Sequence, residues 1–105
     1  MQPVVYIMAS RCRGTLYVGV TSNLVRRAWQ HRNDALPGFT RRYGVHMLVY
    51  YELHARMLDA IRREKQLKEW RRDWKIALIE STNPAWTNLW STIARGEDGS
   101  RLSPG

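Results

Sequence analysis

Four side chains near the start of the chain could act together on an anionic group. They belong to Tyr6, Tyr17, Arg27 and His31. A phenol can hold or release a proton when nearby positive charge stabilises its anion. Arginine presents a planar set of N–H donors that matches phosphate oxygens, and an imidazole can move a proton near neutral pH. These residue types are suited to proton transfer beside a phosphate, provided that folding brings them together.

The two tyrosines lie on segments with the composition of β-strands. Residues 3–8 and 15–20 are rich in β-branched and aromatic side chains. The polar residues 10–14 between them end in glycine, which is typical of a hairpin connection. The sequence therefore predicts two antiparallel strands joined by a short turn.

The register of this hairpin decides whether the phenols meet. The expected pairing places Tyr6 opposite Gly19 and Tyr17 opposite Met8, so that the two phenols are diagonal neighbours on one face of the sheet. A slip of two residues would set the phenols directly opposite each other, whereas a slip of one would put them on opposite faces.

A helix is expected directly after the hairpin. Residues 21–23 offer capping side chains, and residues 24–31 repeat apolar side chains at helical spacing. Arg27 and His31 fall on the apolar face that should pack on the sheet, whereas Arg26 points elsewhere. From the pattern alone, tyrosines that simply pack and an arginine that reaches solvent remain an alternative interpretation.

Residues 45–53 form the third predicted strand. Its apolar side chains occupy both faces, which is typical of a central strand that is covered on both sides. Regular alternation would put Met47, Val49 and Tyr51 on one face of the strand. Leu48 and Tyr50 would then lie on the opposite face.

A long helix is predicted from about residue 55 to residue 71, and Glu64 interrupts its apolar stripe. A carboxylate in that position needs a partner, which could be an arginine or a metal ion. A second helical segment, 72–79, and a short final one, 85–93, should follow. Residues 1–94 are expected to form one domain, and the polar residues 95–105 a flexible tail.

Composition restricts the function further. The chain has 105 residues, 17 Lys and Arg against 9 Asp and Glu, a formal charge of +8 and a pI near 10.4. Such a protein is drawn to polyanions, with nucleic acid the first candidate and an anionic membrane surface the second. The absence of a long apolar run and of a signal-peptide pattern predicts a cytoplasmic protein. Cys12, the single cysteine, excludes an internal disulfide and a zinc cluster.

The ordered set of motifs resembles the GIY-YIG nuclease family, in its small single-domain bacterial branch. The two strand motifs that give the family its name correspond to Val4-Val5-Tyr6 and Tyr17-Val18-Gly19. The resemblance covers roughly residues 3–89, and its remaining segments are 23–31, 39–44, 48–52, 63–68 and 83–86.

This resemblance implies an α/β (α+β) domain with a small, mainly antiparallel three-stranded sheet flanked by helices. It also implies a metal-dependent DNA endonuclease that hydrolyses phosphodiester bonds. Glu64 would hold one Mg²⁺ (or Mn²⁺) ion, and Tyr6 would act as general base. Tyr17 would orient water or phosphate, Arg27 would stabilise the transition state, and His31 would assist proton transfer or hold the phosphate.

Contacts with the nucleic acid are expected from basic side chains and one late asparagine: Arg26, Arg41, Arg42, Lys65 and Asn83. The family's late asparagine could instead be Asn88. The expected partner is DNA, including single-stranded or branched DNA, bound with weak sequence selectivity. Formation of a homodimer is one way in which the protein could select its target. Two departures from the family pattern are Val4 in place of glycine and Val20 where some relatives carry lysine.

Two other functions stay open at this point. The first is a nucleic-acid-binding module that has no catalytic activity. The second is a scaffold that docks on acidic proteins. Salt-sensitive DNA binding without hydrolysis would distinguish the first from an enzyme, and the lack of any nucleic-acid affinity would mark the second.

Overall fold

The computed structural model describes residues 1–94, so the tail predicted at 95–105 lies outside the described residues. Strands and helices follow one another in the order β1 (Val4–Ala9), β2 (Leu16–Thr21), α1 (Leu24–Arg32), α2 (Phe39–Arg42), β3 (Met47–Leu53), α3 (Met57–Glu69), α4 (Arg72–Thr82) and α5 (Trp90–Ala94). None of the helices in the described part of the chain has the length and apolar character to cross a membrane.

The three strands form one antiparallel sheet in the order β2-β1-β3, which confirms the predicted fold class. β1 is the central strand, and all six of its residues are buried. The prediction that residues 45–53 supply the central strand was wrong, because β3 lies at one edge. Helices cover both faces of the sheet, so β1 and β3 each have apolar side chains on both faces. This pattern therefore does not distinguish a central strand from an edge strand.

The hairpin register is the predicted one. Tyr6 pairs with Gly19 and Met8 pairs with Tyr17, so both phenols extend from the same face of the sheet. Their ring centroids lie 6.3 Å apart. A one-residue slip would have put the rings on opposite faces. Because both faces of β1 are apolar, burial alone does not select this register, and the turn between the strands must fix it.

A β-bulge interrupts the pairing of β1 with β3. The register shifts between Ile7 and Met8, which leaves Val49 as an additional residue in β3. Val49 and Tyr50 consequently pack on the same face of the sheet, while Tyr51 packs on the other face. The predicted regular alternation, with Val49 and Tyr51 on one face, was therefore wrong beyond the bulge.

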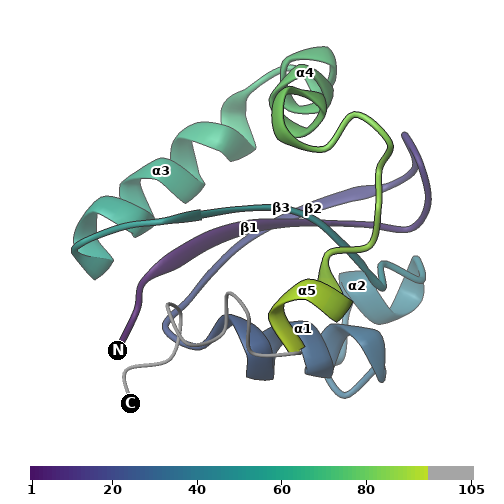
Figure 1. Ribbon diagram of the computed structural model, residues 1–105, viewed down its shortest axis with the longest axis horizontal. Helices are drawn as coiled ribbons and strands as arrows, with labels where there is room; N and C mark the ends of the chain where they lie inside the picture. The colour runs from purple at the N-terminus through teal and green to yellow at the C-terminus, as the bar shows by residue number, and fades with distance from the viewer. Residues whose placement is uncertain (95–105) are drawn as a thin grey trace.

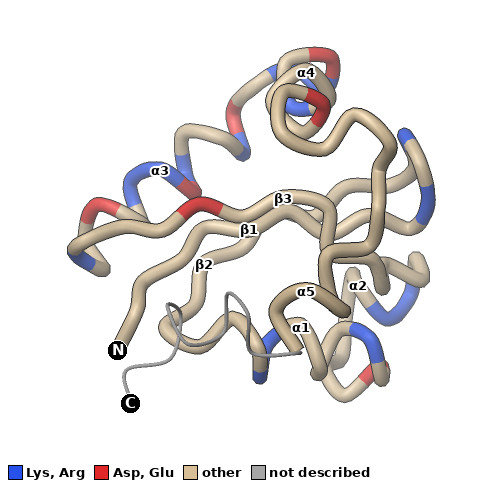
Figure 2. The backbone as a smooth tube through the Cα atoms, in the orientation of Figure 1, with Lys and Arg blue, Asp and Glu red and all other residues tan. Residues whose placement is uncertain are grey.

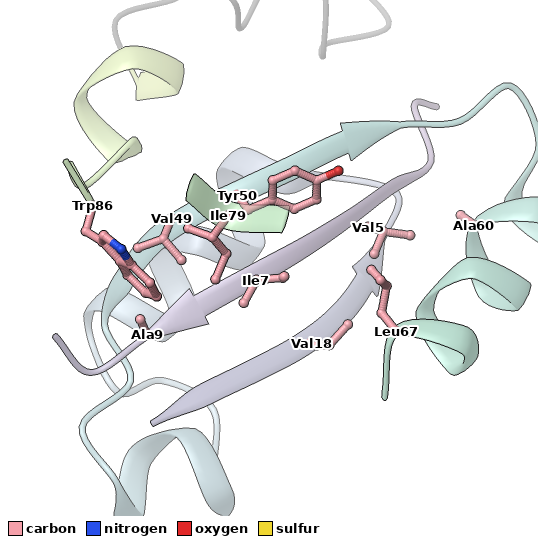
Figure 3. Packing of buried hydrophobic residues seen from close by; sticks show 10 residues of the cluster. All are labelled: Val5, Ile7, Ala9, Val18, Val49, Tyr50, Ala60, Leu67, Ile79 and Trp86. Atoms are coloured by element: carbon pink, nitrogen blue, oxygen red, sulfur yellow. The ribbon is translucent and has the colours of Figure 1, made fainter. Parts of the chain in front are cut away.

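Two helical layers enclose the sheet (Figure 1). The helices α3 and α4 cover one face, where a buried cluster fills the space between the layers (Figure 3): Val5, Ile7, Ala9, Val18, Val49, Tyr50, Ala60, Leu67, Ile79 and Trp86. The helices α1 and α5 cover the other face, with a second cluster: Val4, Tyr6, Met8, Leu24, Ala28, Val45, Leu48 and Ile93. Each face of β1 therefore belongs to a separate core.

The turn of the hairpin is tied to α4. The guanidinium of Arg72 donates to the backbone carbonyls of Arg13 and Gly14, the latter at 2.7 Å. Arg13 in turn forms a two-point ion pair with Glu80, and Glu80 also accepts a 2.7 Å hydrogen bond from the indole of Trp86. This network joins the β1–β2 connection to the last helix of the α3/α4 layer.

The final helix is shorter than predicted because the chain first makes a turn. Trp86 has a positive φ of 56°, and the backbone N–H of Leu89 donates to the carbonyl of Leu48 in β3. Neither feature is compatible with a helix that begins at residue 85. Helical hydrogen bonding starts only at Trp90.

Asn83 holds this turn against the bulge. Its side chain is buried, donates to the carbonyls of Val49 at 3.0 Å and Thr87 at 2.9 Å, and accepts from the Thr87 N–H at 3.0 Å. The additional residue of a bulge has lost its place in the strand ladder, and its carbonyl needs another partner when buried. The Asn83 amide supplies that partner.

We expect Asn83→Ala to lower the free energy of unfolding by about 1–3 kcal/mol, because it leaves buried backbone groups without partners. Urea denaturation measures this difference. The matched control is Asn33→Ala, since Asn33 is an exposed asparagine with one side-chain hydrogen bond at the end of α1, and its loss should change stability by less than about 0.5 kcal/mol. Equal effects of the two substitutions would contradict the role given to Asn83.

Candidate active site

The ring of Tyr6 crosses the edge strand at Gly19. A Cβ atom placed on Gly19 would overlap Cζ and Oη of Tyr6 and would lie 2.9 Å from its Cε1. Tyr6 itself is fully buried, so its ring has no free space into which it can move. Glycine at this position therefore allows the phenol to extend from the central strand across β2.

His31 meets the phenol from α1. Its Nε2 lies 3.0 Å from Oη of Tyr6, and the two rings have centroids 5.5 Å apart. The ring of Tyr17 lies beside both, 5.4 Å from His31. The local sequence explains the placement: Asn23 caps α1 by accepting the N–H of Arg26, and the spacing of the buried residues turns His31 toward the sheet.

Burial keeps His31 neutral. Desolvation, with smaller contributions from the positive charges of Arg27 and His46, lowers the pKa of His31 to about 4. Its Nδ1 is buried and has no hydrogen-bond partner among the described residues. Since nothing at Nδ1 fixes the tautomer, Nε2 can either accept a proton from the hydroxyl of Tyr6 or donate one to it.

Burial also keeps the proton on Tyr6. Desolvation raises the pKa of the Tyr6 phenol well above its ordinary value, and the hydroxyl of Tyr17 and the carboxylate of Glu64 raise it further. A hydrogen bond and the positive charge of Arg27 act in the opposite direction but do not overcome burial. Ionisation of this phenol therefore needs additional positive charge or a simultaneous transfer of its proton.

Arg27 borders two cavities beside these rings. One, of about 350 Å³, is lined by Thr21, Ser22, Asn23, Arg26, Arg27 and Gln30. The other, of about 380 Å³, is lined by Tyr17, Arg27, His31, Leu36, Pro37, Phe39 and Thr40. The Nε of Arg27 donates to the side chain of Gln30 at 3.1 Å, which orients the guanidinium between the two cavities.

Glu64 reaches the same region from α3, on the opposite face of the sheet. Its side chain is only 14% exposed and forms a 3.0 Å ion pair with Lys68, one helical turn later. The ammonium of Lys68 also lies 6.0 Å from the ring centre of Tyr17, and the charge of Glu64 acts on Tyr6. The carboxylate, the lysine and the two phenols therefore lie near one another.

The ion-pair partner of Glu64 in the structure is thus a lysine, whereas the sequence left open an arginine or a metal ion. Sequence reasoning gave Lys68 no role at the site. Its spacing of four residues after Glu64 on one helix face was the signal that could have found it, because such pairs form readily.

The donor set fits a lightly coordinated ion. Within residues 1–94, no group of three or more His, Cys, Asp or Glu side chains is arranged to hold a metal. A single, partly buried carboxylate such as Glu64 suits Mg²⁺, which retains several waters and binds substrate phosphate directly. It does not suit Zn²⁺, which takes at least three protein ligands.

The predicted nucleic-acid contacts fall into two groups. Four side chains, Arg26, Arg41, Arg42 and Lys65, belong to exposed residues on α1, α2 and α3, which carry blue segments in Figure 2. Asn83 is buried, and its amide is fully engaged with the backbone. The structure therefore does not fit a nucleic-acid contact from Asn83, and Asn88 likewise holds the backbone of Leu48 and Trp90.

Comparison with known proteins identifies the family of the chain. Residues 2–77 match the family described as the GIY-YIG catalytic domain. The chain belongs to this family. The match includes Tyr6, Tyr17, Arg27, His31 and Glu64, whereas both candidate asparagines lie beyond its end.

Small bacterial GIY-YIG relatives share most of the chain. A UPF0213 protein of Clostridium perfringens is 35% identical over 77 residues, which is 72% of this chain and 83% of the relative. A UPF0213 protein of Pediococcus pentosaceus is 32% identical over 85 residues, or 80% of this chain and 90% of the relative. Neither name states an activity. No solved structure gives a significant match.

Within the GIY-YIG domain, Gly19→Ala should force the ring of Tyr6 away from the edge strand. We expect a loss of about 1–3 kcal/mol in unfolding free energy, as for other overpacked cores. In a Tyr6→Leu background, which lacks the end of the ring, the same glycine substitution should have a much smaller effect. Equal losses in both backgrounds, measured by urea denaturation, would show that the ring is not responsible.

His31 should make stability depend on pH. Because its folded pKa of about 4 lies below the ordinary 6.5, the unfolded chain binds this proton first as the pH falls. Stability should therefore decrease from pH 6.5 toward pH 4, with about 3 kcal/mol as an upper bound for this group. Urea denaturation at several pH values should give a flatter profile for His31→Gln between pH 6.5 and pH 4, and a slope equal to that of the wild type would contradict this role.

Proposed function

We propose that this GIY-YIG domain is a divalent-metal-dependent endonuclease that hydrolyses phosphodiester bonds in DNA. The observation that supports it best is the meeting of Tyr6, Tyr17, Arg27 and His31 with the carboxylate of Glu64, which acts from the other helical layer. These five polar side chains come from two strands and two helices. Packing of the core alone does not require polar groups at this position.

Arg27 is the proposed phosphate ligand. Its Nε donates to the side chain of Gln30, and the guanidinium borders both cavities. Its remaining N–H groups can donate to the phosphate oxygens as negative charge builds up during hydrolysis. The hydroxyl of Tyr17, on the wall of the larger cavity, can orient the phosphate or the attacking water.

Tyr6 and His31 are the proposed proton-transfer pair. A phenol that burial holds in its protonated form is a poor base by itself. A neutral imidazole 3.0 Å away can take the phenol's proton while Tyr6 takes one from water, so no isolated phenolate has to form. The imidazolium of His31 then returns its Nε2 proton to Tyr6 as Tyr6 gives a proton to the departing oxygen or to solvent, which restores both groups.

Glu64 is the proposed ligand for one Mg²⁺ or Mn²⁺ ion. Such an ion, when bound, polarises the phosphate and stabilises the departing oxygen. The ion pair with Lys68 uses Oε2 of Glu64, and Lys68 is 49% exposed, so it can move into solvent when an ion binds the carboxylate.

One observation favours a second candidate, a DNA-binding module without activity. The ammonium of Lys68 neutralises Glu64 and stands where a cation would approach the carboxylate. If this ion pair persists in the presence of metal, the basic surface can still bind DNA while hydrolysis is blocked.

The deciding experiment incubates the full chain with labelled DNA and Mg²⁺ or Mn²⁺ and compares Glu64→Gln and Tyr6→Phe with wild type. Each substitution should lower the cutting rate by at least about 100-fold, as expected for loss of an electrostatic or proton-transfer group. Binding of Mn²⁺, followed by electron paramagnetic resonance, should be lost in Glu64→Gln and kept in Tyr6→Phe.

The matched control is Glu69→Gln, an exposed glutamate on the same helix, which should cut and bind Mn²⁺ like wild type. A Glu64→Gln variant that still cuts would overturn the metal role. A wild-type chain that binds DNA but does not cut it with either metal would favour the inactive module.

A further inference from the structure

Two aromatic side chains beside the site are exposed although they are large and apolar. Phe39 is 46% exposed and Tyr43 is 48% exposed, and their ring centroids lie 4.7 Å apart. The centroid of Phe39 also lies 6.2 Å from that of Tyr17. We refer to Tyr17, Phe39 and Tyr43 as the aromatic track.

The aromatic track begins inside the candidate active site. Tyr17 contacts the rings of Tyr6 and His31, and both Tyr17 and Phe39 line the 380 Å³ cavity that also holds Arg27. A strand whose phosphate occupied the cavity would therefore continue directly along the rings of Phe39 and Tyr43.

The backbone beneath the outer rings is held in place. Thr40, between them in sequence, is buried, and its carbonyl accepts the N–H of Val45 at 2.9 Å. The short helix α2 is therefore fixed to the segment before β3, while its two rings remain turned toward solvent. Rings that are rigidly supported yet exposed lose little conformational freedom when a flat partner stacks on them.

Charge around the aromatic track favours an anionic strand. Arg41 and Arg42 are exposed on α2, and the guanidinium of Arg42 lies 5.5 Å from the ring centre of Tyr43. Neither α1 nor α2 contains an acidic residue. Rings interleaved with arginines are the combination that binds the bases and backbone of a nucleic acid strand.

We infer that the aromatic track is a subsite that stacks unpaired bases of DNA next to the scissile phosphate. In a duplex the flat faces of the bases are covered by their neighbours, so only an unpaired base can lie on Phe39 or Tyr43. The inference rests on the proposed nuclease function for the position of the phosphate, and it assigns the substrate class as single-stranded DNA or DNA with an unpaired segment.

Equilibrium binding without metal tests the subsite independently of cutting. Fluorescence anisotropy in EDTA compares a short labelled oligothymidylate with a labelled duplex. The Phe39→Ala/Tyr43→Ala variant should bind the oligothymidylate at least about 10-fold more weakly, since each stacked base contributes about 5-fold or more and two rings are removed. Its affinity for the duplex should stay within about 2-fold, because phosphate contacts dominate there.

Trp74→Ala is the matched control. Trp74 is 51% exposed, lies under the guanidinium of Arg71 at 5.4 Å, and belongs to α4 on the other face of the sheet. This variant should bind both probes like wild type. The conservative Phe39→Trp/Tyr43→Phe variant should retain the affinity for the oligothymidylate.

An abasic oligonucleotide tests the same subsite by changing the DNA in place of the protein. Removal of the bases should weaken binding to the wild type and have little effect on the Phe39→Ala/Tyr43→Ala variant. Unchanged binding of the oligothymidylate by that variant, or equal loss for both probes, would overturn the subsite. The proposed nuclease function would survive that result if the wild type cuts DNA, and it would fail separately if the wild type stacks bases but never cuts.

Discussion

The close approach of the Tyr6 ring to the backbone of Gly19 is the constraint on which the site depends. A side chain on β2 at this point would obstruct a ring that extends across the sheet from the central strand. Because the edge strand has no side chain at this point, the ring crosses β2 and brings its hydroxyl to His31. At this position the phenol also experiences the charge of Glu64 from the opposite helical layer, which raises its pKa.

Electrostatics in the site follow from burial more than from the neighbouring charges. The phenol of Tyr6 and the imidazole of His31 are both desolvated, and both are consequently kept neutral. Positive charge is concentrated at the periphery, in Arg27, Lys68 and the arginines of α2. Under the proposed function, this neutral interior with a cationic rim would attract a phosphate to the entrance and keep the proposed proton-transfer groups uncharged before the substrate binds.

Local patterns were enough to predict much of the fold and most of the site. The α1 face that carries Arg27 and His31 follows from the helical period of 3.6 residues, and the hairpin register follows from the short turn between the strands. The bulge at Val49 could not be found this way, because an additional residue leaves no compositional mark in an apolar strand. Asn83 is buried because its side chain bonds to the bulge, so its burial could not be predicted from the sequence either. The edge position of β3 depends on pairing between segments that are distant in the sequence.

The attachment of the hairpin turn to α4 couples the precision of the site to a distant helix. Arg72 and Glu80 hold the loop between the two tyrosine-bearing strands, although neither residue lies near the phenols. Fraying of α4 would release this loop and loosen the relative positions of the two rings. If the proposed function holds, a substitution in α4 that breaks these contacts would slow hydrolysis by loosening the strands, although every proposed catalytic side chain would still be present.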